Sequence, residues 1–139
     1  NHIRQFERLA QNMFICAPHI SQIAALGALD AHDELNQNLK TYKTNRTMLI
    51  DELPKLGFKN FAPPDGAFYF YLDVSEYTDD SVNFAKSILD EVHVAITPGI
   101  DFDSDRGLKT IRLSYACSTS DLKEGLKRLE KFMNKYRIK

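Results

Sequence analysis

The hydrophobic period of this sequence changes twice, and that change constrains the fold more than any other feature. Residues 33–57 carry apolar side chains at spacings of three, four and seven, which is typical of one side of a long helix. Residues 109–116 alternate apolar and polar side chains, with Ile111 and Leu113 on the same face of a predicted strand. Residues 120–136 return to the helical period. Helices therefore come before and after a short β-rich segment.

Prolines, glycines and capping residues define the ends of the predicted elements. Pro18 suits the first turn of a helix, where the missing N–H would have no partner. Pro54 and Gly57 are expected to end the long helix. The apolar run after the Pro-Asp-Gly turn is typical of a central strand covered on both faces. Ser118, with Asp121 three residues later, resembles a capping box for the last helix. We expect helices over 3–13, 18–31, 33–57, 79–91 and 120–136, and strands over 66–74, 93–97 and 109–115.

These elements predict one compact domain of the α/β class, of the α+β type. We expect a two-layer sandwich in which a small mixed sheet has helices against it and is preceded by long helices. The chain also begins inside an amphipathic helical pattern and lacks an initiator Met. We therefore expect a fragment of a longer protein. The apolar residues of that opening pattern are Ile3, Phe6, Leu9 and Met13.

Charge and cysteine content exclude several classes of partner. Eighteen basic and nineteen acidic side chains give a formal net charge of -1, so no long-range field attracts nucleic acid or an anionic membrane. No stretch has the length of a transmembrane helix. Cys16 and Cys117 form no CxxC motif, and Cys16 stands in an apolar run typical of a buried thiol. We expect a reducing, cytoplasmic setting, with neither nucleic acid nor a membrane as partner.

Metal binding is the first site hypothesis that the sequence raises. Asp101, Asp103 and Asp105 match the first three ligand positions of an EF-hand loop, but Arg106 and Arg112 stand where glycine and a bidentate carboxylate are required. We expect a solvated acidic loop and no metal. No phosphate-binding glycine loop and no GxSxG motif is present, so no self-contained catalytic set is predicted. The histidines lack paired ligand spacing and are expected at surfaces or helix ends: His2, His19, His32 and His93.

Arg112 is the remaining candidate. Strand interiors favour β-branched and aromatic residues, so this arginine either faces water, pairs with an acidic side chain, or binds an anion. Thr110 and Ser114 should share its face of the strand, because side chains alternate. A planar guanidinium between short hydroxyl side chains suits a bidentate carboxylate. Most arginines are simply exposed, however, and the pattern alone leaves both interpretations open.

Three stretches resemble a known family when they are taken together. They are NMFICAPHISQIAALGAL, PDGAFYFYLDV and VAITPGIDFDSDRGLKTIRLSYACS. In this order they are similar to the C-terminal, small domain of class I/II, fold-type I aminotransferases that depend on pyridoxal phosphate, as in aspartate and aromatic aminotransferases. The most specific parts are the Pro98-Gly99 break followed by Phe102, and the strand from Arg112 to Ala116.

The resemblance implies a role for Arg112 and a division of the chain. Arg112 matches the arginine that binds the α-carboxylate of the amino-acid substrate. Residues 1–32 would be a helical segment from the end of the large domain, and residues 33–139 the small domain with its connecting helix. Residues 66–69 would lie near the mouth of the site. Residues 12–18 would lie near the join with the large domain and a subunit interface.

The resemblance also implies cofactor and partners. The full-length protein would be a homodimer that binds pyridoxal phosphate and transfers an amino group between an amino acid and a 2-oxo acid. The Schiff-base lysine and the cofactor-binding large domain precede the segment seen here, so the fragment would bind no cofactor and would be inactive alone. Related alternatives are a fold-type I β-lyase, a synthase or an aminotransferase-like regulator. A further alternative is a cofactor-free module that binds a carboxylate or mediates dimerisation.

Overall fold

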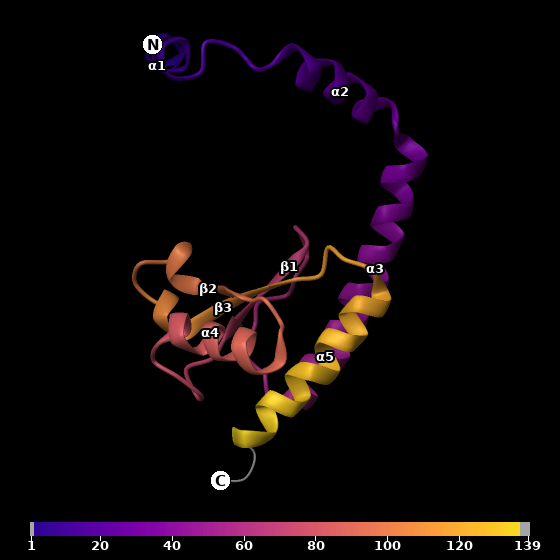
Figure 1. The fold of residues 1–139 in the computed structure, drawn as a ribbon, viewed down its shortest axis with the longest axis vertical. Coiled ribbons are helices and arrows are strands. Elements are labelled where there is room, and N and C mark those ends of the chain that lie inside the picture. The colour runs from indigo at the N-terminus through magenta and orange to yellow at the C-terminus, as the bar shows by residue number, and fades with distance from the viewer. Residues whose placement is uncertain (1, 137–139) are drawn as a thin grey trace. The chain divides into compact units, whose positions relative to one another are not determined.

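The structure, a computed structural model, describes residues 2–136, and the chain divides into two compact units, Asn1–Gln37 and Asn38–Lys139. The predicted ranges 1–32 and 33–139 also include residues 1 and 137–139, which lie outside the described residues. Each unit is described by itself. Figure 1 labels the elements of both.

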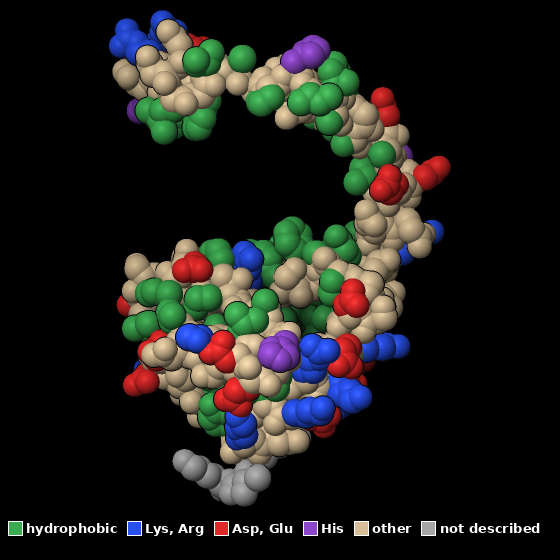
Figure 2. Space-filling view, in the orientation of Figure 1, with side chains coloured by type: hydrophobic (Ala, Val, Ile, Leu, Met, Phe, Trp, Pro, Cys, Tyr) green, Lys and Arg blue, Asp and Glu red, His purple; other side chains and the backbone are tan. Residues whose placement is uncertain are grey.

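The first unit contains helices only. They are α1 (Ile3–Met13), α2 (His19–Asp30) and the start of α3 (His32–Leu56), which continues into the second unit. The predicted helices over 3–13 and 18–31 are thereby confirmed. Neither α1 nor α2 buries any residue, and Figure 2 shows hydrophobic side chains exposed over both. Cys16 and Cys117 are both free and exposed, so the expectation of a buried thiol at Cys16 is wrong.

The second unit is built on a three-stranded sheet with the order β1-β3-β2. Its strands are β1 (Tyr69–Asp73), β2 (Thr97–Pro98) and β3 (Thr110–Ser114). With helices α4 (Ser81–Val92) and α5 (Thr119–Met133), they form the helix-and-sheet arrangement expected from the sequence. Two details of the prediction are wrong. Both strand pairs are antiparallel, so the sheet is not mixed, and the aromatic run forms edge strand β1 whereas β3 is central.

One hydrophobic core joins the sheet to the helices of the second unit. Alternate residues of the strands point into it, because the side chains of a strand alternate between its two faces. The core-facing residues of α5 recur at three and four residues, as the helical period of the sequence predicted. The cluster includes Leu49, Leu53, Phe70, Leu72, Phe84, Ile88, Ile111, Leu113, Leu122, Leu126, Leu129, Phe132 and Met133.

The structure corrects the role expected of Pro54 and the strand expected over 93–97. Helix α3 continues through Pro54 to Leu56, and Gly57, with φ 107°, ends it. Pro54 lies in the last turn, where the following Phe58 N–H returns to the Leu53 carbonyl at 3.0 Å, so only the glycine marks the boundary. The predicted strand over 93–97 is absent from the described residues except at Thr97. His93 takes a left-handed conformation with φ 56° and ends α4, which redirects the chain.

The other helix ends follow the sequence. Ser118 caps α5 by accepting a hydrogen bond from the Asp121 N–H at 3.1 Å. Three short 3-10 helices complete the unit: η1 (Gly99–Asp101), η2 (Gly107–Lys109) and η3 (Asn134–Tyr136). All four histidines are exposed at helix ends, as predicted: His2, His19, His32 and His93. Across residues 2–136, no helix is both long and apolar enough to cross a membrane.

Candidate functional site

Arg112 lies at the centre of the sheet, on the face opposite the hydrophobic core. It stands opposite Tyr71 of β1 and Thr97 of β2, so both neighbouring strands flank it. Its chain neighbours Ile111 and Leu113 are buried, whereas Arg112 itself is half-buried. The predicted alternation along this strand is confirmed. Strand β3 therefore holds the arginine backbone rigidly while its side chain projects away from the core.

Among the described residues, the guanidinium of Arg112 has aromatic neighbours and forms no ion pair with an acidic side chain. Its Cζ atom lies 5.3 Å from the ring centroid of Tyr69 and 4.7 Å from that of Phe102, which are cation–π distances. Among the side chains of residues 2–136, Arg112 Nε is the only buried nitrogen or oxygen atom without a hydrogen-bond partner. Buried polar groups nearly always have a partner, and an exception needs an explanation. The arrangement suits an anion that comes from outside the described residues.

Two glycines bring Phe102 to Arg112. A Cβ atom on Gly99 would stand 2.0 Å from Thr110 Oγ1, and one on Gly107 would stand 2.5 Å from the Ile100 Cα. Only glycine permits such approaches, so η1 and η2 lie directly against each other and against the start of β3. The Phe102 N–H then bonds to the Gly99 carbonyl at 2.9 Å and closes the turn. The Pro-Gly break thus determines where the phenyl ring lies.

Hydroxyl groups around Arg112 are bonded within the protein. Thr110 Oγ1 donates to Tyr71 Oη at 2.8 Å, and Tyr71 Oη donates to the Gly99 carbonyl at 3.4 Å. Ser114 Oγ accepts from the Ala116 N–H at 3.3 Å. These bonds connect β1, β3 and η1 beside the arginine. The small polar side chains expected to surround Arg112 are there, but their hydrogen bonds stabilise the site itself.

A groove of about 540 Å³ lies along the same face of the sheet. Tyr71 and Thr110 line it. Tyr71 stands opposite Arg112 on the neighbouring strand, and Thr110 precedes Arg112 by two residues on the same strand. Arg106 and Lys109 add positive charge to the wall of the groove, and Asp73 adds negative charge. Arg112 itself does not line the groove, which adjoins the arginine only through Tyr71 and Thr110.

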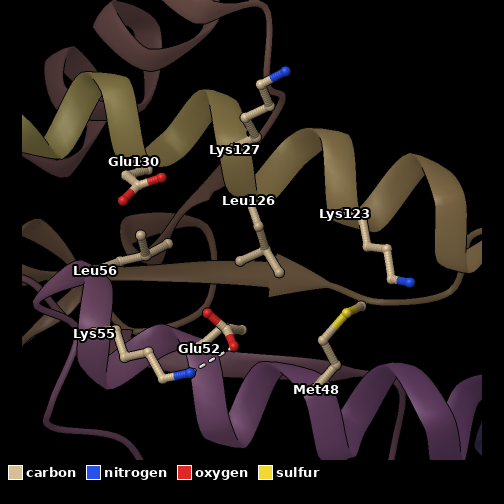
Figure 3. A pocket seen from close by; sticks show the side chains of 8 residues that line it. All are labelled: Met48, Glu52, Lys55, Leu56, Lys123, Leu126, Lys127 and Glu130. Carbon is tan, nitrogen blue, oxygen red and sulfur yellow. Dashed lines mark hydrogen bonds and ion pairs between the residues drawn. The ribbon is translucent and has the colours of Figure 1, made fainter.

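A second groove, of about 390 Å³, lies between α3 and α5 (Figure 3). Glu52 and Lys55 form an ion pair at its base, and Lys127 points away from it. The hydrogen bond that Lys55 donates to the Glu52 carboxylate is the main cause that raises the pKa of Lys55. The remaining charged groups are exposed helix side chains, so nothing in this groove concentrates charge on a ligand.

Within the 101–105 segment, the Asp103 side chain serves the local turn. Asp103 accepts hydrogen bonds from the backbone N–H groups of Arg106 at 3.0 Å and Asp105 at 2.9 Å. Both bonds lower the pKa of Asp103, and the bond from the Arg106 N–H has the larger effect. Within the described part of the chain, no three histidines, cysteines or acidic residues are grouped to hold a metal ion.

The sequence offered Arg112 as a candidate but did not point to the residues that contact its guanidinium. Tyr69 was expected only near the mouth of the site, and Phe102 only as part of a motif. The sequence does contain aromatic residues that could have indicated these contacts. They are the dense aromatic run that leads into β1 and the single phenylalanine after the Pro-Gly break. Residues 12–18, expected near a domain join and a subunit interface, lie in the first unit, and that expectation stays a prediction.

Known proteins are similar to this chain in sequence and in fold. A model of the family described as aminotransferase class I and II matches residues 1–129. The valine-pyruvate aminotransferase of Mycobacterium tuberculosis is 44% identical over 128 residues, which are 91% of this chain and 33% of that protein. The (5-formylfuran-3-yl)methyl phosphate transaminase of Methanocaldococcus jannaschii is 40% identical over 130 residues, or 92% of this chain and 34% of that one.

The fold comparison agrees with the sequence comparison. The crystal structure of a Silicibacter pomeroyi protein superposes with a TM-score of 0.85 at 59% identity, over 96% of this chain and 36% of that one. The chain therefore spans about a third of the length of the proteins that it matches.

Proposed function

This chain belongs to the class I and II aminotransferase family, and on that premise we propose that it is part of a longer enzyme that transfers an amino group between an amino acid and a 2-oxo acid. Arg112 is proposed to bind the α-carboxylate of the substrate. The observation that carries this proposal is the half-buried Arg112 on the central strand, whose guanidinium contacts the uncharged rings of Tyr69 and Phe102 and forms no ion pair among the described residues.

A carboxylate is the anion that this geometry suits best. A guanidinium presents parallel N–H groups that match two carboxylate oxygens, and such charge-assisted pairs are short and directional. Since Nε is buried, an incoming carboxylate would meet the terminal amino groups of Arg112. The neighbouring groove offers room for the remainder of a small molecule.

Fixing the carboxylate orients the rest of the substrate. With one end held on a rigid central strand, the Cα–H bond keeps a constant direction relative to the reacting groups, and orientation of this kind accounts for a large part of many rate enhancements. Arg112 would thus bind and position the substrate without moving a proton. Pyridoxal phosphate, when bound, supplies the electron sink on which amino-group transfer depends.

The described residues fit the substrate side of such a site and not the cofactor side. Their cation on the face of the sheet opposite the core is Arg112, which lies over the rings of Tyr69 and Phe102 and suits a carboxylate. We propose that the pyridoxal phosphate is held by the two thirds of the enzyme that this chain does not span, and that the chain alone binds none. The division at residues 32 and 33, the homodimer and the cytoplasmic setting likewise stay predictions.

The chemistry of the substrate side chain is left open by the relatives. Their names refer to valine and pyruvate in one case and to a furan phosphate in the other, at similar identities to this chain. A β-lyase, a synthase or a regulator of the same fold remains the alternative for the parent protein. Amino-group transfer is favoured because the matched family and both named relatives carry that activity in their names.

The test uses the full-length protein, with Arg112→Ala and Arg112→Lys variants. Valine with pyruvate is the first pair to assay, followed by the other common amino acids. We expect kcat/KM for the best amino acid to fall by a factor of tens to thousands, since removing one member of such a pair costs about 2–5 kcal/mol. Lysine should restore little, because its ammonium cannot bind two oxygens in a fork.

The control is the amine that lacks only the carboxylate of that amino acid. Its slower reaction should be nearly indifferent to both substitutions, and the cofactor absorbance band should persist. Equal losses for amine and amino acid, or an unchanged kcat/KM, would show that Arg112 does not bind the carboxylate.

A further inference from the structure

We propose that Phe102 is a positioning residue, which holds the Arg112 guanidinium in the orientation that receives the substrate carboxylate. This inference rests on the proposed function of Arg112 and goes beyond it, because it assigns the preorganisation of the arginine to a residue on a different element. Phe102 itself need not touch the substrate.

The exposure of Phe102 calls for a reason other than core packing. Its side chain is 54% exposed, and the core cluster of the second unit does not include it. Its ring centroid nevertheless lies 4.7 Å from Arg112 Cζ, closer than the 5.3 Å of Tyr69. An exposed ring gains little stability from burial. When it lies over a cation, it gains cation–π attraction instead.

The backbone around Phe102 is built to keep the ring in place. Gly99 and Gly107 allow η1 to lie against β3 with less space than any side chain needs. The hydrogen bonds from the Phe102 and Asp103 N–H groups to the Gly99 carbonyl, 2.9 and 3.0 Å long, fix the turn. Tyr69 belongs to β1, a different element from the turn that carries Phe102, so the guanidinium contacts two separately anchored rings.

A held arginine should bind a carboxylate more tightly than a free one. An arginine side chain has many rotamers, and ordering a rotamer-rich side chain on binding costs about 0.5–1.5 kcal/mol. The ring contacts restrict the Arg112 side chain before the ligand arrives. The entropy of this side chain is therefore already lost when the protein folds, and not when the carboxylate binds. Loss of the Phe102 ring should therefore weaken carboxylate binding roughly two- to tenfold.

The experiment compares three variants of the full-length protein. Phe102→Leu removes the ring and keeps an apolar side chain, and Phe102→Tyr restores a ring. Leu108→Ala is the matched control, because Leu108 is 46% exposed on the adjacent η2 and no ring contact to Arg112 involves it. Each variant is assayed with the best amino acid, with the matching amine that lacks the carboxylate, and with propionate as an unreactive competitor.

The expected pattern separates positioning from general damage. Phe102→Leu should raise KM for the amino acid and the inhibition constant of propionate roughly two- to tenfold, with kcat changed much less. The amine reaction should not change. Phe102→Tyr should behave like the unmodified protein, and so should Leu108→Ala.

Two outcomes would overturn the inference. One is a Phe102→Leu protein whose KM and propionate constant are unchanged; the other is an equal loss with the amine, which would indicate disturbed folding. Failure of the inference is distinguishable from failure of the proposed function. If Arg112→Ala weakens propionate binding and Phe102→Leu does not, only the role of Phe102 is refuted. If neither substitution has an effect, the carboxylate site itself is refuted.

Discussion

The side chain of Asn45 in α3 donates a hydrogen bond of 2.9 Å to the backbone carbonyl of Cys117, 72 residues later in the chain. The same amide donates to the Tyr115 carbonyl at 3.1 Å and accepts from Thr119 Oγ1 at 2.8 Å. Asn45 is fully buried. One amide therefore fastens the long helix to the segment through which β3 leads into α5, directly after the strand that carries Arg112.

Asn45→Ala should destabilise the second unit by about 2–3 kcal/mol, because buried carbonyl groups would lose their donor. All six tyrosines lie in residues 38–139 and no tryptophan is present, so tyrosine fluorescence during urea unfolding follows this unit alone. Asn38→Ala is the control, since Asn38 is an exposed asparagine on the same helix. Equal unfolding midpoints for the two variants would contradict the structural role of Asn45.

Alanine substitutions at two glycines should change stability in opposite directions. At Gly99 a Cβ would stand 2.0 Å from Thr110 Oγ1 and 2.6 Å from the Thr110 carbonyl oxygen, whereas at Gly125 in α5 nothing lies within 4 Å. Gly99→Ala should destabilise by about 1–3 kcal/mol or more through overpacking against backbone. Gly125→Ala should stabilise by about 0.5–1 kcal/mol, because alanine loses less backbone freedom in a helix. Urea midpoints that move in the same direction would refute this contrast.

The sequence predicted those elements that can be recognised from the hydrophobic pattern of their own residues. Helix α5 and strand β3 place their own apolar residues on one face, so period identifies them. The run around Tyr69 could not reveal its place in the sheet, because being central or at an edge depends on which strands pair with it. The strand expected over 93–97 was wrong for a similar reason: the left-handed turn at His93, directly after α4, is a backbone choice that no apolar pattern encodes.

The candidate site was predictable to the same extent. Arg112 is conspicuous because an arginine is unusual inside a strand. Its contact with Phe102 was not readable, since it depends on how closely η1 can approach β3, and that approach is set by Gly99 and Gly107 together. Spacing along the chain contains no information about such a fit.

Acid should weaken the cap of α4. The Asp80 carboxylate accepts hydrogen bonds from the backbone N–H groups of Asn83 at 3.0 Å and Val82 at 3.1 Å, and the bond from Asn83 is the main cause that lowers the pKa of Asp80. A carboxyl whose pKa is lower in the folded than in the unfolded state stabilises fully above its unfolded value of about 3.9. That stabilisation should fall away as pH drops through the lower, folded pKa.

The measurement compares the original chain with Asp80→Asn in urea unfolding from pH 6 to pH 2. Asparagine still caps but does not ionise, so the stability difference between the two chains should shrink below about pH 4. Asp79→Asn is the charge-matched control, because Asp79 is the exposed neighbour of the cap. A difference that stays constant over the whole range, or one that grows in acid, would show that the carboxylate contributes nothing specific at this helix end.

Replacing Arg112 with methionine should make the chain more stable, although it should abolish carboxylate binding. The guanidinium Nε is buried without a partner among the described residues, and an unsatisfied buried donor costs about 1–3 kcal/mol. Methionine removes that donor and keeps favourable contact with the rings of Tyr69 and Phe102, since thioethers pack well against aromatic side chains. We expect a gain of about 0.5–1.5 kcal/mol in urea unfolding after the lost cation–π attraction is subtracted. A loss of stability would mean that the guanidinium serves the fold and is not reserved for a ligand.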